Sequence, residues 1–463
     1  GGVVVFAPAN ATKEELVARM RDSGATSAIC LSQHYATVKA AAEEAELRSV
    51  IVTSYKEYLR LRDRVLFRLL RERREGHTMP AAVGVQRDPL YTFNGVMRRG
   101  GGGLTIPEPP PAVEDLAAIQ YTNDPGEPPL GVMLTHANLA ANALQVRHWL
   151  PESRPGEERL LAVVPFVHAY GLTTCLNLAP LLGAMLILLP RFETREVLET
   201  IARERPTLFP GVPPMYSRLA NYPGVRKFGI ASIHACISGG SPLPVEVQEA
   251  FEKLTHGRLV EGYGLTEASP VTHATPLSGR RKPRSIGVPL PDTEAKIVDP
   301  ETGADLPPDV PGELVIRGPQ VMPGYWNRPE ETAHALAGGW LHTGDIACVD
   351  EDGYFFIIDK LRDIALSDGR PIYPREIEEA LFEHPAVLDA AAIAVPDAEG
   401  QPRVHAFVAL HPEESATPAE LLEWCRQRLA PYEVPASITL LPALPRTAEG
   451  KVRRAELAAR VAS

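Results

Sequence analysis

The sequence is poor in cysteine and has no hydrophobic run long enough to cross a membrane. Only five of its 463 residues are cysteines, and no two form a CxxC pair. An odd, scattered set argues against a disulfide framework or a zinc site and favours a reducing compartment, the cytoplasm. The longest apolar run, residues 178–190, is too short for a bilayer and contains proline and glycine, so we expect a helix end followed by a strand. The cysteines are Cys30, Cys175, Cys236, Cys348 and Cys425.

An excess of positive charge is also lacking. Lys and Arg number 47 against 58 Asp and Glu, a formal net charge of −11. This balance argues against nucleic acid as the main partner. The chain does have length and 44% hydrophobic residues, enough for two or more globular domains. No signal peptide is recognised, and residues 1–6 (GGVVVF) start without Met inside a strand pattern, so we expect a truncated or processed start.

Strand-like and helical segments alternate through most of the chain, which predicts parallel sheets covered by helices. Residues 12–23 predict a helix, with Thr12 as N-cap and Glu14 and Glu15 in the first turn. A second helix is predicted at 33–46. The predicted strands are 2–6, 26–31, 159–164, 184–189, 208–209 and 235–238.

Other segments depart from this alternation. Residues 72–112 are rich in glycine and proline towards their end and predict a surface linker or loop. Residues 295–321 show short alternating strands with turn signals, which predicts a small antiparallel sheet. After Asp359 a small α+β domain is predicted. Its elements are helix 374–383, strands 388–395 and 403–410, helix 417–429 and strand 437–441.

Six short motifs occur in a fixed order over the second half of the chain. Together they resemble the adenylate-forming superfamily of acyl-CoA synthetases, luciferases and peptide-synthetase adenylation domains. Within it, residues 53–77 and 131–139 are most similar to bacterial long-chain fatty acid–CoA ligases. The six motifs are 239–244 (GGSPLP), 263–267 (YGLTE), 340–345 (WLHTGD), 353–360 (GYFFIIDK), 373–378 (YPREIE) and 444–451 (LPRTAEGK).

The resemblance implies both a fold and a reaction. It implies a large α/β AMP-binding domain over residues 1–359, with parallel sheets and a small antiparallel sheet. A small, mobile α+β domain over residues 360–463 would carry a mobile lysine and rotate about a hinge at Arg362 and Asp363. ATP, Mg²⁺ and a carboxylic acid would give an acyl-adenylate and pyrophosphate, and the thiol of CoA would then displace AMP.

The resemblance also assigns a nucleotide site residue by residue. Asp345 would accept hydrogen bonds from the ribose hydroxyls, and Lys360 takes the place of the family's ribose-contacting Arg without its planar fork. Tyr263 would stack on the adenine. The implied cofactor-binding residues are Thr122, Gly240, Ser241, Pro242, Tyr263, Gly264, Asp345 and Lys360.

Four residues match the family's catalytic positions. Thr266 can donate to a phosphate oxygen, and the carboxylate of Glu267 suits Mg²⁺, which prefers oxygen ligands. His168 matches the histidine at the acyl pocket. Lys451 matches the mobile lysine, whose ammonium offsets the charge that develops as carboxylate and α-phosphate meet.

The phosphate loop departs from the family pattern. That pattern reads YTSGTTGxPKGV, whereas residues 121–132 read YTNDPGEPPLGV. The sequence gains two carboxylates, Asp124 and Glu127, loses backbone N–H groups at prolines, and has Leu130 in place of the lysine. We therefore expect that the altered loop 123–130 weakens adenylation. Asp368, close to the path of CoA in the family, puts the second half-reaction in question as well.

Three functions remain open from the sequence. The first is a ligase of long-chain fatty acids, with fatty acid, ATP and CoA as partners and no nucleic acid. The second is a pseudoenzyme that binds acyl-CoA, AMP or a partner protein, and the third is an aryl-acid ligase or carrier-loading adenylation module. A homodimer is left open.

Residues 60–74 (RLRDRVLFRLLRERR) predict a basic amphipathic helix. Two interpretations are left open for it. In one, the helix makes peripheral contact with an anionic inner membrane; in the other, it packs on the core and exposes a basic face.

Overall fold

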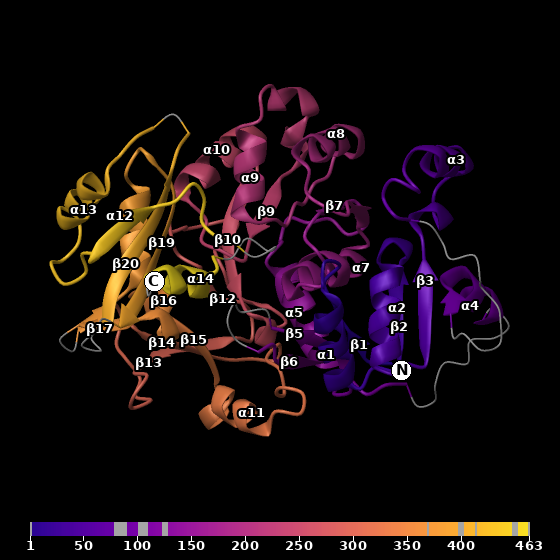
Figure 1. The fold of residues 1–463 in the computed structure, drawn as a ribbon, viewed down its shortest axis with the longest axis horizontal. Coiled ribbons are helices and arrows are strands. Elements are labelled where there is room, and N and C mark those ends of the chain that lie inside the picture. Colours follow the sequence, from indigo (N-terminus) through magenta and orange to yellow (C-terminus); the bar gives the residue numbers. More distant parts are fainter. Residues whose placement is uncertain are drawn as a thin grey trace. The chain divides into compact units, whose positions relative to one another are not determined.

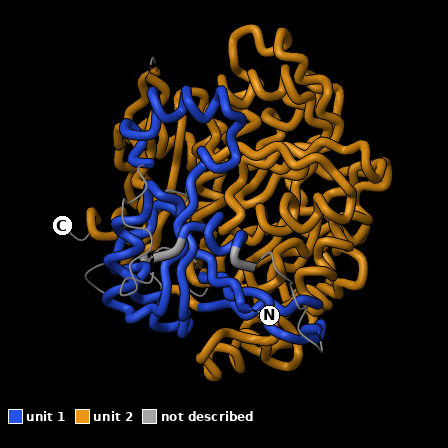
Figure 2. Tube along the Cα trace, turned by 90° about the vertical axis from the view of Figure 1, so that its right-hand side faces the viewer, with its two compact units in different colours: residues 1–121, 131–137 blue, residues 122–130, 138–463 orange. Residues whose placement is uncertain are grey.

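The computed structural model describes residues 2–77, 90–100, 110–122, 128–367, 370–396, 402–412, 414–446 and 452–461. The chain divides into two compact units (Figure 2). Unit 1 comprises Gly1–Tyr121 and Gly131–Ala137, and unit 2 comprises Thr122–Leu130 and Asn138–Ser463. This division does not test the domain boundary expected at residues 359 and 360, which stays a prediction.

Unit 1 contains two small sheets with helices (Figure 1). The first sheet has the order β1-β5-β6, with β1 parallel to β5 and β6 antiparallel, and the second is the parallel sheet β2-β3-β4. The strands are β1 (Val4–Val5), β2 (Ser27–Leu31), β3 (Ser49–Thr53), β4 (Leu90–Thr92), β5 (Leu116–Tyr121) and β6 (Gly131–Thr135). The helices are α1 (Lys13–Ser23), α2 (Tyr35–Glu44), α3 (Leu61–Leu70) and α4 (Phe93–Gly100).

Helix α1 confirms the predicted cap. The Thr12 side chain accepts from the backbone N–H of Glu15, and the Glu15 carboxylate accepts in return from the N–H of Thr12. These two bonds satisfy N–H groups that the first helical turn leaves without partners. Gly24 ends the helix in the left-handed region at φ 65°, where a side chain would be strained.

The expectation of a loop over residues 72–112 was wrong in part. Strand β4 pairs in parallel with β3, and α4 follows it directly. The short sequence Leu90–Thr92 is β-prone and completes the edge of a sheet, a tertiary contact that overrides the glycine and proline nearby. The glycines at 101–103 and the prolines at 107 and 109 lie outside the described residues.

Unit 2 begins with the sheet that confirms the predicted strands at 159–164, 184–189 and 235–238. β7 pairs with β8 and β9 with β10, all in parallel, and Leu208 forms bridges to both Leu160 and Ala235. β11 and β12 extend the sheet in antiparallel fashion. The strands are β7 (Arg159–Ala162), β8 (Met185–Leu188), β9 (Ala235–Ser238), β10 (Arg258–Gly264), β11 (Val271–Ala274) and β12 (Val288–Pro289).

Helices cover this sheet around a buried aromatic core. Phe209, Tyr216 and Phe251 are fully buried, and the Tyr216 ring contacts the other two edge to face. The run at 178–190 is a helix end and a strand, as predicted. The helices are α5 (His136–His148), α6 (Ala169–Gly171), the π-helix η3 (Leu172–Asn177), α7 (Leu178–Leu182), α8 (Thr194–Glu204), α9 (Pro213–Ala220) and α10 (Val245–Thr255).

The predicted small antiparallel sheet is present, with strand order β13-β14-β15-β16. Its strands are β13 (Glu294–Val298), β14 (Gly312–Arg317), β15 (Leu341–Val349) and β16 (Phe355–Lys360), and α11 (Pro329–Ala335) precedes β15. Residues Ile297, Leu314, Ile316, Ala347 and Phe355 form its buried face.

The α+β elements predicted after Asp359 are also present. β19 and β20 pair antiparallel, β21 joins β20 in parallel, and α12 and α13 pack on them. The elements are β17 (Ala365–Ser367), β18 (Arg370–Ile372), α12 (Pro374–Phe382), β19 (Val387–Pro396), β20 (Pro402–Leu410), α13 (Pro418–Arg426), β21 (Ser437–Leu440) and α14 (Arg454–Val461).

Short 3₁₀ turns connect many of these elements. They are η1 (Ser32–His34), η2 (Tyr55–Glu57), η4 (Val225–Phe228), η5 (Ile230–Ser232), η6 (Thr266–Ala268), η7 (Ala337–Gly339) and η8 (Leu361–Asp363). Within the part of the chain that the structure describes, no helix is both long and apolar enough to cross a membrane.

Candidate active site

Asp345 is the centre of a polar cluster in unit 2. Its side chain is buried, and its two carboxylate oxygens have different partners. Tyr263 donates its hydroxyl to Oδ2 at 2.5 Å, and the Nζ atom of Lys360 lies 2.7 Å from Oδ1. Asp345 and Lys360 are directly paired residues of β15 and β16, so the sheet register itself brings them together. Each carboxylate oxygen can accept further bonds, which leaves capacity for ribose hydroxyls.

Tyr263 is the second-last residue of β10, and its ring contacts that of His273. Burial and the neighbouring Asp345 carboxylate raise the pKa of Tyr263 well above its usual value, so its phenol stays a donor at neutral pH. His273 lies behind it at 6.0 Å between ring centroids and contacts Phe355 at 4.7 Å. Burial lowers the pKa of His273 to about 3, and its ring is therefore neutral. The ring of Tyr263 thus packs edge to face against an uncharged neighbour.

Thr266 and Glu267 form the turn η6 immediately after β10. The backbone carbonyl of Glu267 accepts from Met322 N at 2.8 Å, which fixes the turn against the following loop. Its carboxylate Oε1 accepts from the Tyr325 hydroxyl at 2.9 Å. Tyr325 could not be found from the sequence, because it lies 58 residues from Glu267 and no local spacing links it to the YGLTE motif.

The donor set around Glu267 fits a phosphate-bound Mg²⁺. The Glu267 carboxylate is partly buried and is held by the Tyr325 hydroxyl. Mg²⁺ binds carboxylate oxygens of this kind together with phosphates and water. No group of three or more His, Cys, Asp or Glu side chains suited to a metal occurs among the residues described. Glu267 would therefore hold such an ion together with its nucleotide.

Gly240, Ser241 and Pro242 lie in the turn after β9. Gly240 has φ 82°, a conformation that favours glycine, and the three residues are exposed, which leaves their backbone open to a flat ligand. The N–H of Leu243 then donates to Glu261 Oε2 at 3.2 Å, tying the turn to β10.

Glu261 is a further titratable group at this turn that sequence reasoning missed. Burial raises its pKa to about 7, while the bond from the Leu243 N–H and the charge of Arg375 act in the opposite direction. The carboxyl group thus changes charge near neutral pH. Its only sequence signal is an acidic residue inside an otherwise apolar strand.

His168 caps the short helix α6 and is partly buried. Next to it, Tyr170 donates its hydroxyl to the Ile237 carbonyl and its ring lies beneath Gly239, where an added Cβ atom would be only 3.2 Å away. Gly171 is required as well, because a Cβ there would meet the Pro165 carbonyl oxygen at 2.4 Å. Tight packing thus fixes the segment that carries His168.

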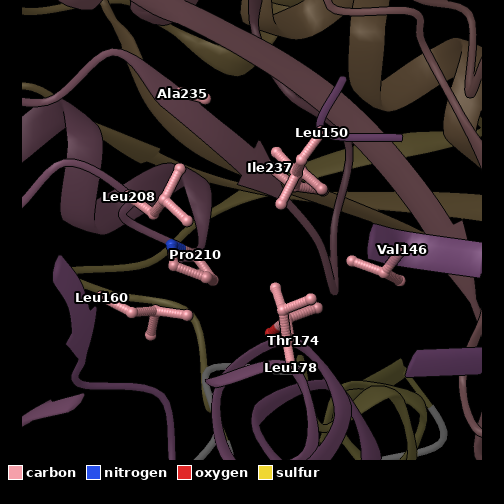
Figure 3. A pocket seen from close by; sticks show the side chains of 9 residues that line it. All are labelled: Val146, Leu150, Leu160, Thr174, Leu178, Leu208, Pro210, Ala235 and Ile237. Atoms are coloured by element: carbon pink, nitrogen blue, oxygen red, sulfur yellow. The ribbon is translucent and has the colours of Figure 1, made fainter. Parts of the chain in front are cut away.

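Behind this segment lies a small apolar cavity (Figure 3). Its only polar side chain is that of Thr174, whose hydroxyl donates to the Tyr170 carbonyl at 2.7 Å. The volume of the cavity is about 10 Å³, room for one water-sized group and not for an acyl chain. The lining residues are Val146, Leu150, Leu160, Thr174, Leu178, Leu208, Pro210, Ala235 and Ile237.

The two ends of the atypical loop are tied to each other. The N–H of Thr122 donates to the Leu130 carbonyl, and the Leu130 N–H donates to the Thr122 hydroxyl, both at 2.9 Å. The Thr122 oxygen is therefore partly engaged in closing the loop, and Leu130 brings no cation. Asp124, Glu127, Asp368 and Lys451 lie outside the described residues.

Gly264 and the hinge segment are the remaining positions that the sequence singled out. A Cβ at Gly264 would lie 2.0 Å from the Pro270 carbonyl oxygen, so only glycine fits. At the hinge, Asp359 accepts from the backbone N–H of Arg375 at 2.8 Å, and Asp363 pairs with Arg454 at 3.4 Å. The structure thus brings Tyr263, Asp345 and Lys360 into direct contact and leaves the roles assigned to the site as predictions.

Comparison with known proteins supports the family likeness. Residues 1–326 match the family described as AMP-binding enzyme, and residues 376–451 match the AMP-binding enzyme C-terminal domain. A long-chain-fatty-acid–CoA ligase of Bacillus subtilis is 42% identical over 99% of this chain and 81% of its own. A feruloyl-CoA synthase of an Amycolatopsis species is 38% identical over 76% of this chain and 71% of its own. The ATP-bound crystal structure of MatB from Rhodopseudomonas palustris has a TM-score of 0.75 and 26% identity, over 96% of this chain and 93% of that one.

Proposed function

Because this chain belongs to the AMP-binding enzyme family, with its large N-terminal and small C-terminal domains, we propose that it is an AMP-forming long-chain fatty acid–CoA ligase with slowed adenylation. That it is a ligase of the acyl-CoA synthetase type follows from the family and from its relatives. The proposal concerns the identity of the acid substrate, the roles of the site residues and the slowed adenylation. The observation that carries it is the contact of Tyr263 and Lys360 with Asp345, a preformed acceptor for a nucleoside.

The first half-reaction joins the acid to AMP. A carboxylate oxygen of the acid forms a bond to the α-phosphorus of ATP, the bond between the α- and β-phosphates breaks, and pyrophosphate leaves with its electron pair. Asp345 would hold the ribose, Gly240, Ser241 and Pro242 would line the adenine, and Tyr263 would stack on it. Thr266 and Lys451 would donate to the phosphate and carboxylate oxygens, whose charge density rises in the transition state.

A Mg²⁺ ion held by Glu267 would neutralise negative charge on the phosphates. The Tyr325 hydroxyl orients the Glu267 carboxylate for that role. Lys360, whose Nζ atom lies 2.7 Å from Asp345 Oδ1, would hold the orientation of the ribose-binding carboxylate. In the second half-reaction the thiolate sulfur of CoA would bond to the acyl carbon, the bond from that carbon to the phosphate oxygen of AMP would break, and AMP would leave with the electron pair.

The acid is proposed to be long and apolar. The relative with 42% identity is a long-chain-fatty-acid–CoA ligase. The aryl-acid alternative draws on the feruloyl-CoA synthase likeness over 76% of the chain. A panel of acids that includes ferulate and benzoate separates the two.

The pseudoenzyme alternative draws on the phosphate loop. Leu130 stands where the family has a cation, and its backbone is engaged with Thr122. We propose that this loop slows adenylation and leaves nucleoside binding intact. Trapping the acyl-adenylate by mass spectrometry after mixing ATP, Mg²⁺ and an acid tests the proposal directly. Failure to form it from any acid, with AMP still bound, supports the pseudoenzyme.

A cytoplasmic location is proposed, because scattered cysteines that form no disulfide suit a reducing compartment. The five cysteines are unpaired. A homodimer stays an untested expectation.

A further inference from the structure

Helix α3 presents its apolar residues to solvent. No residue of this helix is buried. Five of its six large apolar side chains retain more than half of their accessible surface, between 53% and 76%. Single exposed apolar residues are common on protein surfaces, but five of them on one short helix form a patch. An exposed apolar patch of this kind marks an interaction surface. The residues are Leu61, Val65, Leu66, Leu69 and Leu70.

The inward side of α3 is marked by Phe67. Its ring, which is partly buried, lies 5.3 Å from that of the buried His77, between ring centroids. Two residues along an α-helix correspond to a rotation of about 200°, so Val65 and Leu69 lie on the side opposite Phe67. Leu61 shares their row at a spacing of four residues. Figure 1 shows α3 beyond the end of β3 and not on the sheet. The apolar row therefore faces away from the packing of unit 1.

This arrangement contradicts the interpretation of α3 as a core-packed helix with a solvated basic face. In such a helix the row Leu61, Val65 and Leu69 would be buried. The sequence pattern gives the spacing of the apolar residues but does not say which way the row faces. The contact of Phe67 with His77 decides it.

Positive charge surrounds the apolar row. Residues 60–74 contain seven arginines and only two carboxylates, although the whole chain has a net charge of −11. One of the two carboxylates, Glu72, is buried and paired with Lys56, so it does not offset the arginines at the surface. Arg62 and Arg68 are both exposed. Exposed hydrocarbon among arginines is the chemistry of a helix that lies in an anionic lipid interface.

We propose that α3 is a docking surface for an anionic lipid bilayer. Leu61, Val65 and Leu69 enter the boundary between headgroups and acyl chains, and the surrounding arginines contact the anionic headgroups. Pairing with α3 of a second copy is disfavoured, since it would bring two arginine-rich helices together. The proposal does not rest on the ligase reaction, although a docked enzyme would meet long-chain acids where they partition.

Vesicle sedimentation tests the surface without ATP or acid. The full chain is mixed with vesicles of phosphatidylcholine alone or of phosphatidylcholine with phosphatidylglycerol. We expect sedimentation with the anionic vesicles that weakens as salt is raised. The double variant Leu61→Ser/Leu69→Ser and the triple variant Arg68→Ser/Arg73→Ser/Arg74→Ser should each lower the partition coefficient about tenfold or more.

A matched control removes exposed leucines elsewhere. Leu188 and Leu388 are 62% and 50% exposed and lie on strands of unit 2. Leu188→Ser/Leu388→Ser should sediment as the unchanged chain does. Vesicle binding that does not depend on phosphatidylglycerol would overturn the proposal. An equal loss of vesicle binding in the control variant would overturn it as well.

A fluorescence measurement distinguishes lipid from protein as the occupant. The emission of Leu69→Trp, after subtraction of the unchanged chain, should shift to the blue only when anionic vesicles are added. A blue-shifted emission without vesicles would show that protein covers the row. A dimer in sedimentation equilibrium that Leu61→Ser/Leu69→Ser dissolves would likewise assign the surface to a second copy and end the lipid proposal.

Discussion

The Nζ atom of Lys360 lies 2.7 Å from Oδ1 of Asp345, across the paired strands β15 and β16. The other carboxylate oxygen accepts from the Tyr263 hydroxyl. A buried carboxylate held from both sides loses little freedom when it accepts bonds from a ligand, which is what a nucleoside site requires.

Removing this carboxylate should weaken nucleoside binding. Asp345→Ala is expected to lower AMP affinity about 10- to 100-fold, since hydrogen bonds to charged groups contribute about 1.5–3 kcal/mol. Lys360→Ala should have a smaller effect. Lys296→Ala is the control, because Lys296 pairs with Asp305 at 2.6 Å in the same sheet, away from the cluster. Unchanged AMP affinity in Asp345→Ala, by calorimetry, would remove the ribose role.

The second prediction concerns Glu267 and its hydroxyl donor. Glu267→Gln should raise the Mg²⁺ concentration needed for half-maximal pyrophosphate release about tenfold or more, because a neutral amide is a poorer ligand. Tyr325→Phe should shift it in the same direction by less. Tyr354→Phe serves as control, since the Tyr354 hydroxyl donates to the Arg280 carbonyl instead. An unaltered Mg²⁺ dependence in Glu267→Gln would place the ion elsewhere.

Stability should fall in acid because of His273. Its pKa is about 3 in the folded chain against a usual 6.5, so between these values the unfolded state binds more protons. Its contribution to the free energy of unfolding is complete above pH 6.5 and is lost by about 1.4 kcal/mol per pH unit as pH falls towards 3.

The variant His273→Phe isolates this contribution. It keeps a ring against Phe355 and removes Nε2, which is buried and has no hydrogen-bond partner among the residues that the structure describes. Urea unfolding at several pH values should show the variant gaining stability relative to the unchanged chain as pH drops below 6.5. A difference that does not vary with pH would contradict a neutral, buried His273.

Two glycines of the site motifs should respond differently to a methyl group. Gly264→Ala should be strongly destabilising because its Cβ would meet the Pro270 carbonyl oxygen at 2.0 Å. Gly344→Ala should cost only about 1–2 kcal/mol for its φ of 65°, since no atom lies within 4 Å of the added Cβ. Comparable melting temperatures for the two variants would argue against the close approach at Gly264.

Local chemistry made much of the fold predictable. Thr12 with Glu15 determines where α1 begins, and short apolar runs predict most of the strands of the parallel sheets. The loop expected over residues 72–112 was wrong at β4 and α4, because β4 depends on pairing with β3, which no local pattern encodes.

Contacts between distant segments limited the prediction of the site. Asp345 and Lys360 were each assigned from motifs, but their direct contact depends on the register of β15 and β16, which shifts at Ile346 and Ala347. Tyr325 reaches Glu267 through tertiary packing alone. The outward direction of the row on α3 needed the position of Phe67.

Pyrophosphate release with acids from acetic to octadecanoic tests the central claim most directly. It should be measured on this chain and on a variant with the family's loop: Asn123→Ser, Asp124→Gly, Pro125→Thr, Gly126→Thr, Glu127→Gly and Leu130→Lys. Each lost donor costs on the order of 10²–10³ in rate, so the rebuilt loop should release pyrophosphate at least about 100-fold faster, fastest with the longest acids, while both chains bind AMP equally. An unaltered chain that already turns over at an ordinary rate of about 1–10³ s⁻¹, or a rebuilt one that prefers short or aromatic acids, would contradict the account.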